Sequence, residues 1–304
     1  MTQHTAPTPF LKWAGGKRKL APLLIESFPS SFDGHKHRYF EPFIGGGALA
    51  FALGDTSKDF FIPGKNLFIN DMNPELVITY EVIRDDVSAL IKELGRLSNK
   101  INEKIYYEMR ASSPRGKVKR AARFIFLNKT CFNGLWRVNS KGEFNVPFGK
   151  AKNPTLFSEE NLRACSARLQ ESTITLGGFE DAIKRARKGD LVYFDPPYIP
   201  LTPSASFSQY SKENFGTKDH ERLQSTIQSL TDRGVFVLLS NSDTPLTRKT
   251  FQKSLTLRRI LMARNISSSG NNRKPVFEIL GMNYPHRRKT SMGELEVISR
   301  PNRG

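Results

Sequence analysis

The segment Asp195-Pro196-Pro197-Tyr198 combines residue types that can position a reactive amine. It directly follows residues 190–194 (DLVYF), an apolar run that predicts a buried strand. The two prolines remove backbone donors and stiffen the turn, so the Asp195 carboxylate and the backbone carbonyls form a mouth rich in hydrogen-bond acceptors. Such a mouth accepts the hydrogens of an exocyclic amine and directs its nitrogen lone pair outward, toward an electrophile. Tyr198 offers an aromatic face on which a planar base can stack.

A glycine-rich segment, residues 40–47 (FEPFIGGG), lies between a predicted strand and a predicted helix. Doubly wound folds hold ligands at such a junction, where glycines such as Gly45 and Gly47 allow close approach to the backbone. Asp71 ends the next predicted strand and can accept hydrogen bonds from ribose hydroxyls. The segment is not GxGxxG, so an adenosine ligand without a pyrophosphate fits it better than a dinucleotide. A tight turn with a helix-capping aspartate is the alternative interpretation.

A second glycine-rich segment, residues 10–17 (FLKWAGGK), precedes the first predicted strand. Its lysines suggest phosphate binding, but Arg18 follows Gly16-Lys17 and no glycine stands five residues before Gly16. The Walker pattern is therefore broken. Trp13 beside Lys17 can instead contact a flat adenine and a carboxylate.

The elements that must position these residues follow from hydrophobic periodicity. The predicted strands, which are apolar and rich in β-branched and aromatic residues, are 38–44, 67–71, 190–194 and 234–239. The predicted helices are 47–54, 74–95, 158–171 and 219–233. Ser158 and Thr217 are the predicted N-caps of the last two. Strand alternating with helix predicts an α/β layered fold built on a parallel sheet.

Residues 110–152 are the most basic stretch, with eleven basic residues against a single acid, Glu143, and with six interleaved aromatic residues. Within this stretch, residues 135–146 predict a β-hairpin in which Gly142 supplies a positive φ. A hairpin that carries an arginine can enter the major groove of DNA. A solvated charged face on an ordinary insertion is the alternative.

The composition favours a polyanionic partner, because 304 residues carry a formal net charge of +18. The length allows two lobes. We expect a soluble, cytoplasmic protein, since no run approaches the roughly 18 apolar residues of a spanning helix and the N-terminus lacks an apolar signal core. Cys131, Cys165 and five scattered histidines favour neither a disulfide framework nor a metal site. The ends, 1–8 and 286–304, are expected to be disordered.

The order of these motifs resembles the Dam-type family of DNA adenine-N6 methyltransferases over residues 8–285. The resemblance is carried by FLKWAGGK, FEPFIGGG, NDMNP, NKTCFNGLWRVNSKGEFNVPFG, YFDPPY and SNSDTPLTR. It implies a Rossmann-like S-adenosylmethionine methyltransferase core, residues 1–73 and 173–285, with an inserted helical and β-hairpin target-recognition domain, residues 74–172, and a basic tail at 286–304. It also implies S-adenosylmethionine as cofactor, no metal, double-stranded DNA as partner and no membrane. The implied protein is a monomer, bacterial or phage-encoded, that lies in the cytoplasm in association with the nucleoid.

The resemblance assigns roles to residues at matching positions. Asp195 and the Pro196 carbonyl bond N6 of a flipped adenine and Tyr198 stacks on its ring, with Pro197 completing the catalytic motif. The implied cofactor contacts are Trp13, Lys17, Glu41, Gly45, Gly47, Asp71 and Asp195, with Glu41 facing the methionine amino group. The implied DNA contacts are Lys12, Phe132, Asn133, Leu135, Arg137 and Pro147. The implied target is the palindrome GATC.

Two residues depart from the pattern of the family: Trp136 replaces a smaller residue, and Phe132 lacks the hydroxyl of a tyrosine. Either change can alter how DNA is held. The same chemistry on cytosine N4, on another adenine site or on RNA adenine stays open, as does an inactive, sequence-specific DNA-binding protein. The missing GxGxxG disfavours a nicotinamide oxidoreductase.

Overall fold

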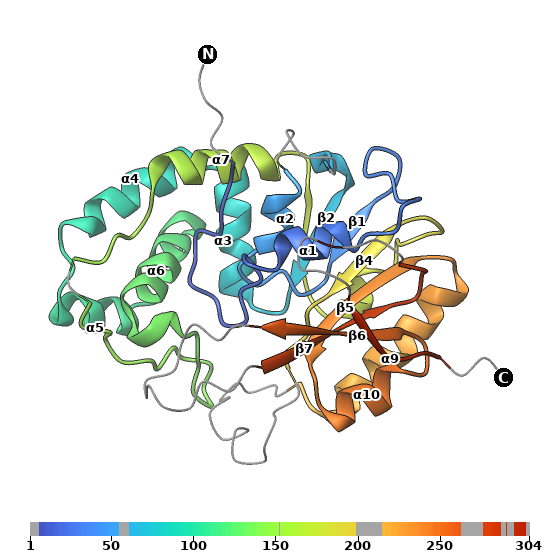
Figure 1. The fold of residues 1–304 in the computed structure, drawn as a ribbon. Helices are drawn as coiled ribbons and strands as arrows, with labels where there is room; N and C mark the ends of the chain where they lie inside the picture. The colour runs from blue at the N-terminus through green and yellow to red at the C-terminus, as the bar shows by residue number, and fades with distance from the viewer. Residues whose placement is uncertain are drawn as a thin grey trace.

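A mostly parallel sheet with helices packed around it forms the centre of the molecule (Figure 1). The computed structural model describes residues 6–54, 61–151, 153–198, 215–262, 276–286, 290 and 295–301. In these ranges the sheet has the strand order β3-β2-β1-β4-β5-β7-β6-β8. The strands are β1 (Tyr39–Glu41), β2 (Leu67–Asp71), β3 (Thr173–Leu176), β4 (Leu191–Phe194), β5 (Phe236–Ser242), β6 (Thr256–Met262), β7 (Val276–Met282) and β8 (Glu296–Ser299). Strands β1 to β5 pair in parallel, whereas β7 is antiparallel to β5 and β6.

The helices divide between the sheet and one end of the molecule. They are α1 (Ala21–Glu26), α2 (Ala48–Ala52), α3 (Pro74–Asp85), α4 (Val87–Ser98), α5 (Glu103–Ala111), α6 (Lys117–Thr130), α7 (Glu159–Leu169), α8 (Phe179–Ala182), α9 (Thr217–Asp232) and α10 (Pro245–Phe251). Figure 1 shows α4, α5 and α6 at one end, and α9 and α10 beside the antiparallel strands at the other. None of the helices in the described ranges is long and apolar enough to cross a membrane.

Successive side chains of a strand point to opposite faces of the sheet. Helices cover both faces, so apolar residues are found on both. Tyr39 of β1 and Tyr193 of β4 face one core, which extends to α1, α2, α3, α6 and α7. Their neighbours Phe40 and Phe194 face the other core, which α8, α9 and α10 complete. A smaller cluster around Phe126 packs the end that contains α5 and α6. The first core is continuous from the strands into α3 and α6, so no gap in packing separates these helices from the sheet.

The predicted α/β fold and its four strands are confirmed, with shifted ends. The predicted helix at 74–95 is instead two helices, because Asp86 leaves the helical conformation at φ −146°. Ser158 caps α7 as predicted and accepts a hydrogen bond from the Asn161 backbone N–H. Thr217 was wrongly predicted as an N-cap: Gly216 holds that position and Thr217 lies inside α9.

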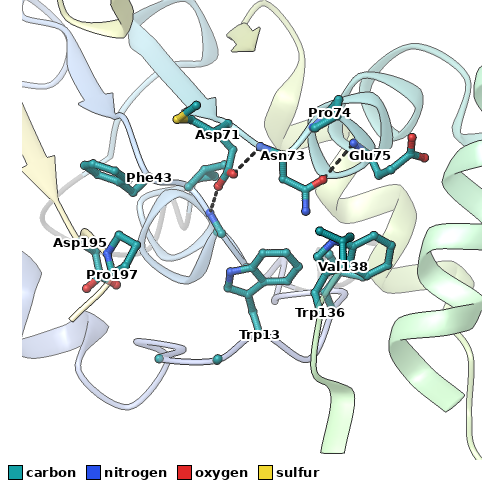
Figure 2. A pocket seen from close by; sticks show the side chains of 18 of the residues that line it. Trp13, Phe43, Asp71, Asn73, Pro74, Glu75, Trp136, Val138, Asp195 and Pro197 are labelled. Carbon is teal, nitrogen blue, oxygen red and sulfur yellow. Dashed lines mark hydrogen bonds between the residues drawn. The ribbon is translucent and has the colours of Figure 1, made fainter. Parts of the chain in front are cut away.

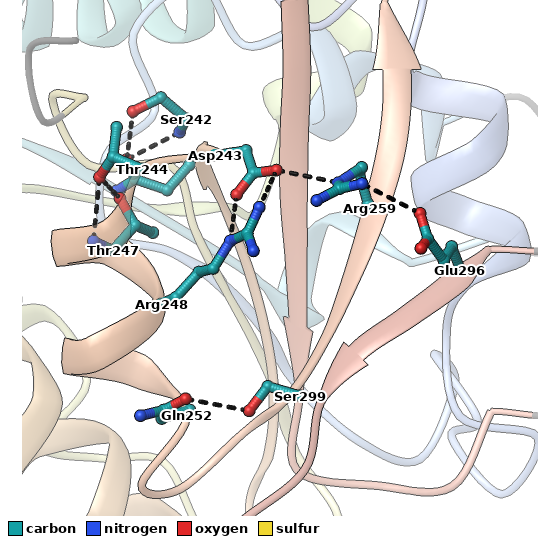
Figure 3. A network of polar contacts seen from close by, with 10 residues as sticks. Ser242, Asp243, Thr244, Thr247, Arg248, Gln252, Arg259, Glu296 and Ser299 are labelled. Carbon is teal, nitrogen blue, oxygen red and sulfur yellow. Dashed lines mark hydrogen bonds and ion pairs between the residues drawn. The ribbon is translucent and has the colours of Figure 1, made fainter.

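The prediction of a disordered tail at 286–304 is wrong for β8, which pairs with β6. Glu296 of β8 forms an ion pair of 3.3 Å with Arg259, and Ser299 Oγ donates to Gln252 Oε1 at 3.1 Å (Figure 3). Arg259 in turn contacts Asp243 at the end of β5. These polar contacts tie β8 to β6 and the end of α10. The strand has four residues, and such a short run was too weak a signal to reveal it.

The other predicted disordered end, residues 1–8, is only partly described. The backbone N–H and Oγ1 of Thr8 both donate to Asn161 Oδ1 at 2.9 Å, so the expectation is wrong at Thr8. Residues 1–5 lie outside the described residues.

Candidate functional site

A cavity of about 2000 Å³ opens where the strand order reverses between β1 and β4. Parallel sheets bind ligands at this point, beyond the carboxyl ends of the strands. Glu41 ends β1, Asp71 ends β2 and Asp195 follows β4, and all three line the cavity. Three segments distant in the sequence therefore bring carboxylates to one site.

The glycine-rich loop after β1 is fixed by Asp71. Its two carboxylate oxygens accept hydrogen bonds from Gly45 N at 3.1 Å and from Asn73 N at 2.9 Å (Figure 2). Gly45 and Gly47 have φ values of 47° and 71°, which favour glycine. A Cβ atom at Gly47 would lie 2.5 Å from the hydroxyl oxygen of Tyr80, so this loop has no space for a side chain there.

Trp13 and Lys17 reach the same cavity from the segment before β1. A Cβ atom at Gly45 would lie 2.8 Å from the Trp13 ring, so the indole packs directly on the glycine loop. Lys17 Nζ lies 3.0 Å from Asp195 Oδ1 and 4.5 Å from the centre of the Tyr198 ring. Lys17 is buried, so this ion pair is shielded from solvent. The structure therefore brings residues 10–17 (FLKWAGGK) into contact with the Asp-Pro-Pro-Tyr turn.

Glu41 has a buried carboxylate whose Oε2 has no hydrogen-bond partner among the described residues. Burial, followed by the nearby charge of Asp195, raises the pKa of Glu41 to about 8. Unpartnered buried oxygens are uncommon and indicate a missing donor. A cationic amino group beside Oε2 satisfies this atom, so the residues fit an amino acid ligand such as the methionine part of S-adenosylmethionine.

We expect binding of S-adenosylmethionine to release a proton from Glu41. Near pH 7 the carboxyl is largely protonated, and a cationic amino group favours its ionised form and lowers its pKa. Affinity should therefore rise from about pH 6 to about pH 8, and this rise should be weaker in Glu41→Gln. Calorimetry in two buffers of different ionisation enthalpy measures the number of protons released on binding. The ligand's own titration is common to both proteins, so identical proton release would contradict the role of Glu41.

Asp195 is held by two donors that act on one of its oxygens. Oδ1 accepts from Ser240 Oγ at 2.8 Å and faces Lys17 Nζ, while Oδ2 makes no hydrogen bond to the described residues. Ser240 is fixed in turn by the hydroxyl of Tyr193 at 2.8 Å. This arrangement leaves Oδ2 available to accept a hydrogen from a substrate amine.

Two residues of this site were not anticipated from the sequence, Ser240 and Glu278. Ser240 lies on β5, and Glu278 of β7 accepts a hydrogen bond of 2.9 Å from the Tyr198 hydroxyl. Burial raises the pKa of Glu278, and the nearby Lys17 opposes this shift. Ser240 belongs to the SNSDTPLTR motif, which was the available signal for it, whereas no motif marked Glu278.

The residues predicted to contact DNA lie in two groups. Lys12, Phe132, Asn133, Leu135 and Pro147 are all exposed. Asn128 ties their segments together: its amide oxygen accepts from Lys12 N at 2.9 Å, and its amide nitrogen donates to the carbonyls of Lys12 and Gly134. The backbone N–H of Phe132 donates to the Pro147 carbonyl at 2.9 Å.

Arg137 lies on the neighbouring turn and is half-buried. Its Nε donates to Asn145 Oδ1 at 2.8 Å. The predicted hairpin is present as a tight turn with one antiparallel bridge, Val138 to Phe144, in place of two strands. Gly142 has the predicted positive φ, at 80°.

The strand order and the site at the switch point define a Rossmann-like methyltransferase fold. A family model for D12 class N6 adenine-specific DNA methyltransferases matches residues 13–265, and the chain belongs to this family. It is 40% identical to the Type II methyltransferase M.MjaIII of Methanocaldococcus jannaschii, over 91% of this chain and 99% of the relative. It is 39% identical to the Type II methyltransferase M1.LlaDCHI of Lactococcus lactis subsp. cremoris and 33% identical to the DNA adenine methylase of Escherichia coli strain K12, each over 91% of this chain and 95% of the relative. The protein is an adenine-specific DNA methyltransferase of a family that uses S-adenosylmethionine.

Proposed function

We propose that this enzyme methylates N6 of adenine within GATC in double-stranded DNA. The observation that carries the chemistry is Asp195 Oδ2, which makes no hydrogen bond to any described residue and lies in the cavity that Glu41 and Asp71 also line. An amine acceptor and a cofactor-binding loop then share one cavity. Methyl transfer needs this proximity because positioning supplies much of its rate.

The cofactor is assigned to the wall formed by the glycine loop. Glu41 accepts hydrogens from the methionine amino group, and Asp71 retains lone pairs for ribose hydroxyls. Trp13 lines the other side of the loop, and Gly45 and Gly47 permit close approach. Bound S-adenosylmethionine supplies a methyl group on a positively charged sulfonium.

The target adenine is assigned to the Asp-Pro-Pro-Tyr turn. Rotating a base out of a duplex costs about a few kcal/mol, which stacking and phosphate contacts offset. Asp195 Oδ2 and the Pro196 carbonyl accept the two hydrogens of N6 and so direct its lone pair toward the methyl group. Tyr198 provides the stacking face, with its hydroxyl held by Glu278. The proton leaves N6 for solvent after the nitrogen has become cationic.

The GATC assignment is supported by the residues that match the Dam-type pattern on the DNA-facing surface. Lys12, Asn133, Leu135 and Pro147 are exposed, and Arg137 lies on the adjacent turn. An arginine can donate two hydrogen bonds to guanine, which distinguishes this base in the major groove.

The decisive experiment compares two duplexes that differ only in an intact or a scrambled GATC, with the methylated base identified by mass spectrometry after digestion. We expect N6-methyladenine in the intact duplex alone. Product in both duplexes would reject the GATC target and keep the chemistry, and N4-methylcytosine would reject the base assignment.

The remaining proposals concern organisation. We propose that residues 74–172 serve as the target-recognition domain and that residues 1–73 and 173–285 serve as the catalytic domain. The division is one of role, since a single core joins α3 and α6 to the sheet. We also propose a monomer that acts in the cytoplasm, where its DNA substrate lies.

A further inference from the structure

A row of aromatic rings connects the glycine loop to the turn that carries Arg137. The Trp13 ring packs against Gly45 and lies 6.2 Å from the ring of Phe124 on α6, measured between centroids. Trp136 lies 4.2 Å from Phe124 and 4.5 Å from Phe144 across the turn. These four rings, Trp13, Phe124, Trp136 and Phe144, are called the aromatic row below.

The row joins two parts of one cavity. Trp13, Trp136 and Val138 line it together (Figure 2). Gly45 at the cofactor end and Phe144 at the turn are also lining residues. A shift of the Trp13 ring therefore has a packed route to the turn, because closely packed side chains move together and leave few gaps.

Hydrogen bonds within the turn close it: the antiparallel bridge from Val138 to Phe144, a few backbone hydrogen bonds, and side-chain hydrogen bonds made by Arg137 and Asn139. These bonds shape the turn but do not attach it to α6. The Trp136 ring, between Phe124 of α6 and Phe144, packs the turn against that helix. Trp136 also directly precedes Arg137, so its position sets the starting point of the arginine side chain.

We propose that Trp136 is a positioning residue that couples occupation of the glycine loop to the placement of Arg137, and thereby determines how strongly site-specific DNA binding depends on bound cofactor. This inference rests on the proposed DNA-reading role of Arg137. Coupling of this kind is reciprocal: DNA with the correct site must tighten cofactor binding by the same factor. The quantity to measure is the factor by which the DNA site changes cofactor affinity.

The test measures binding of S-adenosylhomocysteine by calorimetry, alone and with saturating duplexes that carry or lack the site that the wild-type enzyme methylates. We expect the site to tighten binding at least about fivefold in the wild type and at most about twofold in Trp136→Leu. Trp136→Phe keeps a ring in the row and should restore most of the effect. Affinity without DNA is measured for each variant as its own reference, so the ratio with and without the site reports the coupling alone.

Two controls separate coupling from folding and from the proposed function. Val297→Ala changes an exposed residue of β8 far along the sheet order from the site, and should keep the wild-type coupling. If Trp136→Leu does not fold, Trp136→Met replaces it, and thermal unfolding checks both. A folded variant that lacks the ring and keeps the wild-type coupling would overturn the proposal. So would a wild-type enzyme whose cofactor affinity is the same with both duplexes. Absence of methylation in the wild type would instead contradict the proposed function.

Discussion

Replacing Asp195 with alanine should lower the rate of methyl transfer by at least about 10³-fold while DNA binding is retained. A single preorganised polar group in an enclosed site is commonly worth about 10²- to 10³-fold in rate, and here the lost carboxylate both accepts from N6 and orients its lone pair. The basic surface around Lys12 and the turn is unchanged, so bulk affinity for DNA should persist. Single-turnover methylation measures the chemical step, and fluorescence anisotropy measures binding. Normal single-turnover methylation by this variant would refute the mechanism.

Stability has to be separated from activity in this experiment, because Asp195 also neutralises buried Lys17. Among the described residues, removing the carboxylate leaves the ammonium with the Gly15 carbonyl, the Tyr198 ring and the nearby charge of Glu278. Breaking a buried ion pair by removing one partner costs about 3 kcal/mol. The double variant Lys17→Met, Asp195→Ala removes that charge and should recover most of the stability without recovering transfer. Thermal unfolding of both proteins checks this distinction.

The local parts of the site were accessible from the sequence because each depends on a short segment. Residues 195–198 could be interpreted from the two stiff prolines and the preceding strand. Gly45 and Gly47 have the positive φ values that glycine allows. Asp71 ends its strand as predicted, although its observed contacts are to backbone N–H groups of its own neighbourhood. Period and turn chemistry act over a few residues, so a single sequence contains them.

Contacts between distant segments were not accessible in the same way. Ser240 and Glu278 reach the turn because β5 and β7 are neighbours in the sheet, and the antiparallel insertion of β7 has no signature in local periodicity. The same limit hid β8, whose support comes from Arg259 and Gln252 on other elements. The pairing of Lys17 with Asp195 likewise depends on the folding of the first segment across the end of β4. Each of these contacts is determined by which elements pack together in the folded protein.

Replacing Arg137 with alanine should have the second large effect, a loss of discrimination between DNA sites. An arginine that donates two hydrogen bonds to a guanine contributes about 1–3 kcal/mol of discrimination, so Arg137→Ala should reduce the preference for the intact site by about 5- to 150-fold. Nε is engaged by Asn145 Oδ1, which orients the guanidinium and leaves the terminal nitrogens to read a base. The contact from Nη2 to the Asn145 carbonyl is 3.5 Å long and easily exchanged for a stronger acceptor. Asn145→Ala should therefore also relax discrimination, by a smaller factor.

Lys141 provides the matched control, since it is an exposed cation at the tip of the same turn. If its role is limited to phosphates, Lys141→Ala should weaken binding of the intact and altered duplexes equally and lower the salt dependence of both. The ratio of kcat/KM between a GATC duplex and one with its guanine replaced isolates the base contact, because phosphate contacts cancel in this ratio. An unchanged ratio in Arg137→Ala would exclude Arg137 as the reader of that guanine. An equal loss of ratio in Lys141→Ala would show that the placement of the whole turn, and not one arginine, determines the choice of site.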